Sequence, residues 1–198
     1  MKERKHFSPA IVQRLAQQLY LLEAAHQDLL EGTVPEAFLS LESVRDSLAD
    51  PARTDAFATR LRAMYEAWSR RRGMHLTVLE TTKDPWRVIL AISGFGAARL
   101  LAPERGEHVL EGAEGTPTRP RARVRVVVAA QAVAPAAEKD GALLRQARAA
   151  CDAVAASLAL QVVRRYREEP SPLVRDSVRG WRTGHLDRVL GGDFDLFS

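Results

Sequence analysis

Cysteine is nearly absent: Cys151 is the single cysteine among 198 residues. No disulfide can form within the chain, so we expect a reducing compartment, the cytoplasm. Cys151 lies in the alanine-rich run 149–153, which indicates a small buried core residue. His75 and His108 stand isolated in the sequence and there is no second thiol, so we expect no metal site and no other cofactor.

A long apolar run is also missing. Residues 1–7 are charged and lack the apolar stretch typical of a signal peptide. Nothing approaches the roughly 18 uninterrupted apolar residues that a membrane-spanning helix needs. We therefore expect no membrane partner. With 46% apolar residues, the composition is that of an ordinary folded protein rather than a disordered one.

The sequence has no strong excess of one charge. Its 29 Lys and Arg residues oppose 25 Asp and Glu residues, which leaves a formal net charge of +4. A mildly basic balance is compatible with an RNA partner, but many proteins that bind no nucleic acid share it. Net charge alone therefore leaves the partner open.

The first 32 residues predict a helical segment that stands apart from the rest. Ser8 followed by Pro9 is typical of a helix start, and Gly32 is a common stop. Apolar residues recur at helical spacing between these ends. This apolar stripe needs a partner, either the main body or another protein chain. Its members are Ile11, Leu15, Leu19, Leu22 and Leu29.

Residues 33–198 mix helix and strand patterns without a regular repeat, which indicates an α+β fold. Glycine, proline and charge dominate residues 106–121, so we predict an exposed loop there. Strands are expected within 34–44, 76–78, 86–92, 124–130 and 160–166, and helices within 50–72, 143–158 and 186–190. Gly94 and Gly96 predict a turn into a short segment at 97–102.

The helix expected within 50–72 carries the strongest core prediction. Four large apolar residues fall on one helical face, and we expect them to be buried against a sheet that contains Val88, Leu90 and Val126. The four are Phe57, Leu61, Met64 and Trp68.

Several segments, in order along the chain, resemble motifs of class I peptide-chain release factors. Residues 64–74, MYEAWSRRRGM, are similar to the family pattern MYxRWAxRRGx. Residues 92–108, ISGFGAARLLAPERGEH, resemble IxGxxAYGxLKxExGVH. Residues 173–176, LVRD, and 182–197, RTGHLDRVLGGDFDLF, resemble the LVKD segment and the C-terminal signature. These pieces lie between residues 37 and 197, with a gap in the middle.

The resemblance implies a fold as well as partners. It implies that 33–198 form a mixed sheet with packed helices like the codon-recognition superdomain, domains 2 and 4, of a release factor. A truncated remnant of domain 3 would lie at about 132–168. The partner implied is the ribosome, through ribosomal or messenger RNA.

The catalytic motif of that family is missing. Release factors hydrolyse peptidyl-tRNA through a Gly-Gly-Gln loop, whose backbone N–H stabilises developing charge. No Gly-Gly-Gln occurs in this chain, since Gly191-Gly192 is followed by Asp193. The Gly-rich stretch and the Ser-Pro-Phe or Pro-x-Thr tripeptides that read the codon are also missing. We therefore expect neither enzyme activity nor ordinary termination, and assign no catalytic residue.

Two basic segments are candidates for RNA contact. Arg123 and Arg125 alternate with valines, so they should share one strand face. With their neighbours they form an acid-free cluster suited to phosphate binding. The cluster consists of Arg119, Arg121, Arg123 and Arg125. A second basic strand carries Arg164, Arg165 and Arg167.

These observations favour a non-catalytic factor that binds the ribosome or RNA. Two alternatives remain open at this stage. One is a protein-interaction module that keeps the release-factor fold without RNA contact. The other is an RNA-binding protein that acts off the ribosome in transcript protection or processing. A hydrolase triad of Ser177, His185 and Asp187 has no supporting motif or spacing.

Overall fold

A computed structural model describes residues 8–34, 36–45, 50–112, 121–131, 141–159 and 161–195. The helices are α1 (Pro9–Glu31), α2 (Pro51–Arg71), α3 (Ala97–Leu101), the short 3-10 turn η1 (Ala102–Glu104), α4 (Ala142–Ser157) and α5 (Leu186–Leu190). The strands are β1 (Ala37–Val44), β2 (His75–Lys83), β3 (Trp86–Ser93), β4 (Gly106–Leu110), β5 (Ala122–Ala130), β6 (Val162–Arg167), β7 (Leu173–Asp176) and β8 (Arg182–Thr183).

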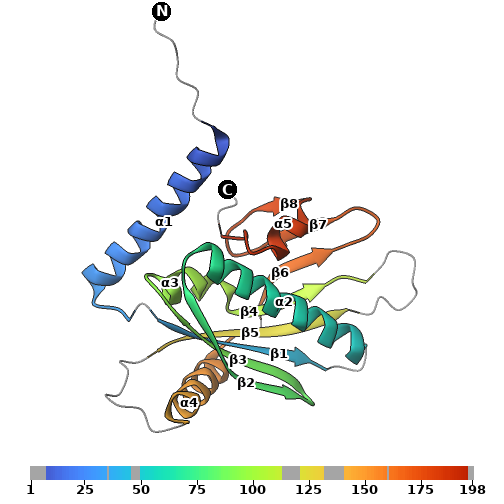
Figure 1. The fold of residues 1–198 in the computed structure, drawn as a ribbon. Coiled ribbons are helices and arrows are strands. Elements are labelled where there is room, and N and C mark those ends of the chain that lie inside the picture. Colours follow the sequence, from blue (N-terminus) through green and yellow to red (C-terminus); the bar gives the residue numbers. More distant parts are fainter. Residues whose placement is uncertain are drawn as a thin grey trace, which may run out of the picture.

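All eight strands of the described residues join one sheet, in the order β2-β3-β1-β5-β4-β6-β7-β8 (Figure 1). β4 and β6 pair in parallel, whereas the other neighbours pair antiparallel, so the sheet is mixed. Helices pack on this sheet and α1 precedes it. The predicted α+β class, with a mixed sheet and an N-terminal helix, is therefore confirmed.

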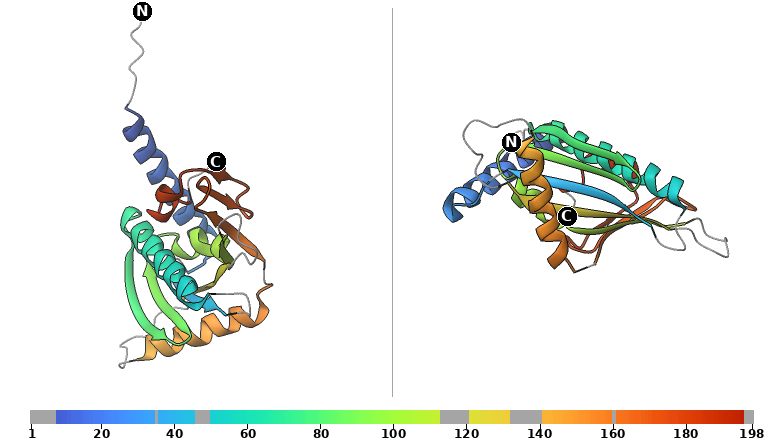
Figure 2. Two further views of the ribbon diagram at one scale, coloured as in Figure 1. Left: turned by 90° about the vertical axis from the view of Figure 1, so that its right-hand side faces the viewer. Right: turned by 90° about the horizontal axis from the view of Figure 1, so that it is seen from below.

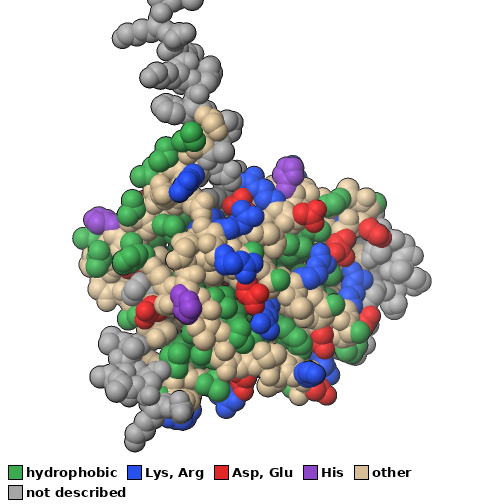
Figure 3. All heavy atoms as spheres, in the orientation of Figure 1, with side chains coloured by type: hydrophobic (Ala, Val, Ile, Leu, Met, Phe, Trp, Pro, Cys, Tyr) green, Lys and Arg blue, Asp and Glu red, His purple; other side chains and the backbone are tan. Residues whose placement is uncertain are grey.

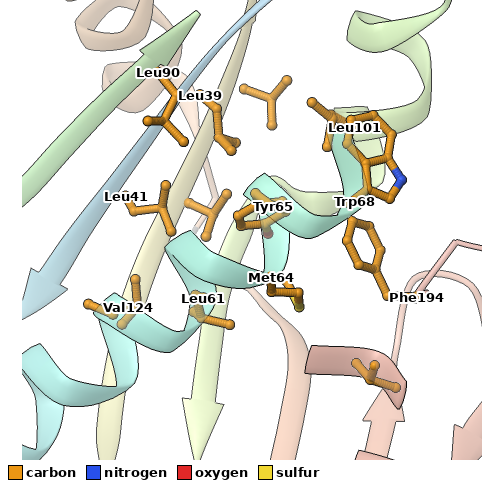
Figure 4. Close-up of a cluster of buried hydrophobic side chains, with 14 of the residues drawn as sticks. Leu39, Leu41, Leu61, Met64, Tyr65, Trp68, Leu90, Leu101, Val124 and Phe194 are labelled. Carbon is orange, nitrogen blue, oxygen red and sulfur yellow. The ribbon is translucent and has the colours of Figure 1, made fainter. Parts of the chain in front are cut away.

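Helix α2 builds the main core on one face of the sheet. Asp50 caps its first turn, because its Oδ1 accepts hydrogen bonds from the backbone N–H groups of Ala52 and Arg53. The predicted apolar face is confirmed: the four side chains are at most 1% exposed and pack with Val88, Leu90 and Val126. Figure 4 shows three of them, Leu61, Met64 and Trp68, among strand and C-terminal side chains.

Helix α4 covers part of the opposite face of the sheet. Its Ala147 and Cys151 are buried against Phe38, Ile89 and Val127. Cys151 is 1% exposed, as predicted, and burial raises the pKa of its thiol to about 11. This thiol stays protonated at neutral pH and serves as a packing group.

Helix α1 touches the body along one side and otherwise extends from it (Figures 1 and 2). Gln17 donates a 2.7 Å hydrogen bond from Nε2 to the backbone oxygen of Arg71. Further along the helix, Asp28 and Glu31 both bind Arg99. The predicted apolar stripe is not used in these contacts: its five members are between 51% and 79% exposed.

The loop expected at residues 106–121 was wrong at its start. Residues 106–121 were predicted to be an exposed loop, but Gly106–Leu110 form the fully buried strand β4 between β5 and β6. Glu107 and His108 are themselves buried in β4, and each has a partner. Glu107 pairs with Arg123, and His108 bonds Tyr166 Oη and the backbone oxygen of Glu104. Residues 113–120 lie outside the described residues.

The segment from α5 to Asp195 packs against the end of α2. Phe194 stacks on Trp68 with ring centroids 6.0 Å apart and meets Tyr65 edge to face. Asp195 Oδ2 accepts hydrogen bonds from Trp68 Nε1 at 2.8 Å and from Arg72 Nε at 3.0 Å. The MYEAWSRRRGM and C-terminal motifs of the sequence therefore meet in one buried cluster.

Candidate nucleic-acid interface

A row of arginines crosses the sheet from β5 to β8. Arg123 on β5 pairs with Val109 on β4. On the other edge of β4, Val109 pairs with Arg165 on β6. Arg165 in turn pairs with Arg175, and Arg175 with Arg182. Directly paired residues project from the same face of a sheet. Since neighbouring strands lie about 4.8 Å apart, the row extends for about 19 Å.

Residues two positions away on the same strands extend this row. Arg125 follows Arg123 along β5, Arg167 follows Arg165 along β6, and Arg121 directly precedes β5. Arg121, Arg175 and Arg182 are exposed, and the others are partly exposed. We name the whole set the arginine face: Arg121, Arg123, Arg125, Arg165, Arg167, Arg175 and Arg182.

Helix α4 stops short of this surface. Along β5, Ala129 and Val127 lie beneath α4, whereas Arg125 and Arg123 are the next residues on the same side. Seen from below, α4 crosses one end of the strands and the strands continue past it (Figure 2, right). The end of the sheet that α4 leaves open is thus the end that carries the arginines.

Two glutamates moderate the positive charge. Arg123 makes a bidentate ion pair with Glu107, with its Nη2 2.7 Å from Oε1 and its Nε 3.1 Å from Oε2. Arg125 lies opposite Glu42 on β1 and opposite Glu107 on β4. The buried Nε of Arg125 has no hydrogen-bond partner among the described residues. Arg123 is therefore partly held by the fold, and the more exposed arginines are better placed for a ligand.

The structure brings most of the predicted site residues together. Arg123 and Arg125 lie on one face of β5, as the alternation predicts. Arg121 directly precedes this strand, and Arg119 lies outside the described residues. Sequence reasoning missed Arg175 and Arg182. They join the face only through cross-strand pairing, and nothing in the local sequence signals it.

Arg164 does not belong to this surface, which corrects the reading of the second basic strand. It alternates with Arg165 and therefore points to the α2 side, where it is fully buried. Its Nη2 lies 2.7 Å from both Glu104 Oε1 and Asp176 Oδ2, and Arg179 binds the same two carboxylates. Arg165 and Arg167 remain on the arginine face.

The buried network around Arg164 shifts the pKa values of several of its members, Glu104 and His108 among them. Burial alone would raise the pKa of Glu104, but the charges of Arg164 and Arg179 lower it to about 2. Burial lowers the pKa of His108 to about 4, against the smaller opposing effect of Glu104. His108 is therefore neutral at physiological pH, and each buried carboxylate faces an arginine. This pattern is that of a satisfied structural network.

Other kinds of site find little support. Across the described ranges, no group of three or more His, Cys, Asp or Glu side chains is arranged to hold a metal ion. Ser177, His185 and Asp187 are exposed. Within the part of the chain that the structure describes, no helix is long and apolar enough to span a bilayer.

Comparison with known proteins gives a fold likeness alone. No protein-family model matches the sequence, and no curated protein matches it. Among solved structures, RF2 of Thermus thermophilus is similar, with a TM-score of 0.61 and 15% sequence identity. The match covers 97% of this chain and 76% of that chain. The fold is therefore release-factor-like.

Proposed function

We propose that this chain is a non-catalytic factor on the release-factor fold that binds the phosphate backbone of ribosomal or messenger RNA through the arginine face. The observation that carries the proposal is the row of Arg123, Arg165, Arg175 and Arg182 on a part of the sheet that α4 leaves open. Guanidinium groups pair well with phosphate oxygens. A row of arginines about 19 Å long can contact several consecutive phosphates of one RNA strand.

The ribosome is the RNA target that the release-factor likeness favours. The motif resemblance and the structural likeness to RF2 support the same family of folds. Backbone contacts of the kind proposed position a protein on RNA without reading its sequence. This suits a chain whose codon-reading motifs are missing, because attachment would not depend on a stop codon.

The absence of catalysis is the second part of the proposal. The chain contains no Gly-Gly-Gln, and between β5 and β6 it carries helix α4, which is packed on the sheet by Ala147 and Cys151. A factor of this kind would occupy, sense or block a site on the ribosome without releasing the peptide.

Salt dependence of RNA affinity tests the proposal directly. We expect Arg175→Ala and Arg182→Ala each to weaken binding to a labelled single-stranded RNA oligomer and to purified ribosomes. Each lost phosphate contact should make the slope of log affinity against log salt shallower by about 0.7. Arg70→Ala is the matched control, because Arg70 is an exposed arginine on α2, on the other side of the sheet.

The outcomes separate the alternatives. Variants that keep the wild-type slope and affinity, with unchanged thermal melts, would show that the arginine face is not the RNA contact. A wild-type protein that binds neither RNA nor ribosomes at low salt would favour the protein-interaction module. Binding to free RNA but not to ribosomes would favour a role off the ribosome.

A further inference from the structure

Helix α1 carries an apolar seam that the other described residues leave exposed. Six residues recur at alternating steps of three and four, the heptad spacing of helices that pair along their length. Five of the six are aliphatic and the other is a histidine. We call this set the outer seam: Val12, Leu15, Leu19, Leu22, His26 and Leu29.

The opposite side of α1 holds the body. Gln17, Ala24 and Glu31 are seven residues apart, and each contacts the body: Gln17 at Arg71, Ala24 beside Gly96 and Glu31 at Arg99. In a heptad these positions lie about half a turn from the seam. α1 therefore has one face fixed to its own chain and another directed away from it.

The outer seam is exposed over most of its length. Val12 and Leu15 are 54% and 53% exposed, Leu19 and Leu22 are each 66%, and Leu29 is 79%. Figure 3 shows hydrophobic side chains along the side of α1 that faces away from the sheet. Ile11 and Leu30, which are 51% and 67% exposed, lie beside the seam and widen this apolar surface.

The residues that flank the seam indicate which partner fits. When the heptad positions next to a seam carry a row of charges of one sign, the helix pairs better with another protein of opposite charge than with a second copy of itself. Here only Glu23 is charged among the six flanking residues, so two identical helices meet no row of like charges. Two of the flanking residues are alanines, which let helices approach closely. The flanking residues are Ile11, Ala16, Gln18, Glu23, Ala25 and Leu30.

We propose that the outer seam binds the outer seam of a second copy of this chain, so that two α1 helices form a paired-helix dimer. A repeat of three heptads is self-complementary, because each apolar side chain meets an equivalent one on the partner. Because each α1 contacts its own body on the side opposite the seam, the two sheets would lie on opposite sides of the helix pair. The arginine face takes no part, so the dimer does not depend on RNA binding.

Sedimentation equilibrium of the full chain tests this proposal. We expect the wild type to move from a mass of 21.9 kDa toward twice that value as its concentration rises through the micromolar range. The double variant Leu19→Lys, Leu22→Lys should stay at the monomer mass, because it places two charges in the seam of each copy. Val178→Lys, a matched change at another exposed apolar residue, should dimerise like the wild type.

Circular dichroism melts provide the folding control. Leu19 and Leu22 do not contribute to the core of the single chain, so the double variant should keep its helix content and main transition. A wild type that remains monomeric at millimolar concentration would overturn the proposal. A double variant that dimerises as well as the wild type would overturn it too, since the dimer would then use another surface.

Discussion

The indole Nε1 of Trp68 donates a 2.8 Å hydrogen bond to Asp195, a residue 127 positions further along the chain. The same carboxylate binds the guanidinium of Arg72, whose side chain is 1% exposed. One acidic side chain thus satisfies two buried donors on the last turns of α2. This contact ties the C-terminal segment to the central core.

Removing the Asp195 side chain should strongly lower the free energy of unfolding. Asp195→Ala leaves Arg72 with only the more distant Asp193, 3.6 Å away, and leaves Trp68 Nε1 without its acceptor. Breaking a buried ion pair costs about 3–5 kcal/mol of unfolding free energy. Urea unfolding measures this loss, with exposed Asp187→Ala as the control, expected within about 0.5 kcal/mol of wild type. Equal stability of the two variants would contradict the contact.

Gly192 and Gly180 allow a second comparison of a test variant with a matched control. Both have positive φ, +86° and +74°, so alanine strains the backbone at either site by about 1–2 kcal/mol. A Cβ at Gly192 would also lie 2.4 Å from the backbone nitrogen of Trp68, whereas a Cβ at Gly180 has nothing within 4 Å. We expect Gly192→Ala to be insoluble or far less stable than Gly180→Ala in thermal melts. Similar melting temperatures would disprove this tight packing.

Acid should destabilise the protein through His108. Burial holds its pKa near 4 in the folded state, against 6.5 as the ordinary value. The unfolded chain therefore binds this proton first, and stability falls as pH drops from about 6.5 toward about 4. Between pH 7.5 and pH 5 this amounts to about 2 kcal/mol.

Replacement of His108 isolates that contribution. His108→Gln cannot titrate in this window, and the amide retains a donor for the backbone oxygen of Glu104. Urea unfolding at both pH values should show a clearly smaller pH effect in this variant. Glu104 binds its proton mainly below pH 4.5 in the unfolded chain and only near pH 2 in the folded protein, so it contributes little to the pH effect above pH 5. An unchanged pH dependence would show that His108 is not the responsible group.

Peptide release is the remaining prediction. Because the chain has no Gly-Gly-Gln, stoichiometric protein should release no peptide from a ribosome complex that carries a stop codon. The readout is labelled peptide freed from peptidyl-tRNA, compared with a reaction without factor. Release above that background would require another catalytic group in this chain.

Much of this fold can be predicted from periodicity. The apolar face of α2, with Phe57 and Trp68, follows the helical repeat, and β5 follows the alternation of Val124 with Arg123 and Arg125. These patterns involve residues that are close together in the sequence, so they can be recognised without knowledge of the folded structure.

The features that sequence analysis missed depend on distant residues. Glu107 and His108 in β4 are buried because Arg123, Tyr166 and the backbone of Glu104 satisfy them, and composition does not show these partners. Arg164 and Arg165 look alike in the sequence but project from opposite faces of β6. The assembly of Arg175 and Arg182 with Arg165 requires the register of three strands.

The central position of β1 has a consequence for synthesis of the chain. β1 is the first strand to be made, yet its neighbours β3 and β5 are completed only at residues 93 and 130. Until then its apolar stretch, Ala37–Leu41, presents unpaired backbone groups, as an edge strand open to aggregation does. Cotranslational folding must therefore begin with an incomplete sheet, and chaperone protection of nascent chains would matter most before β5 emerges.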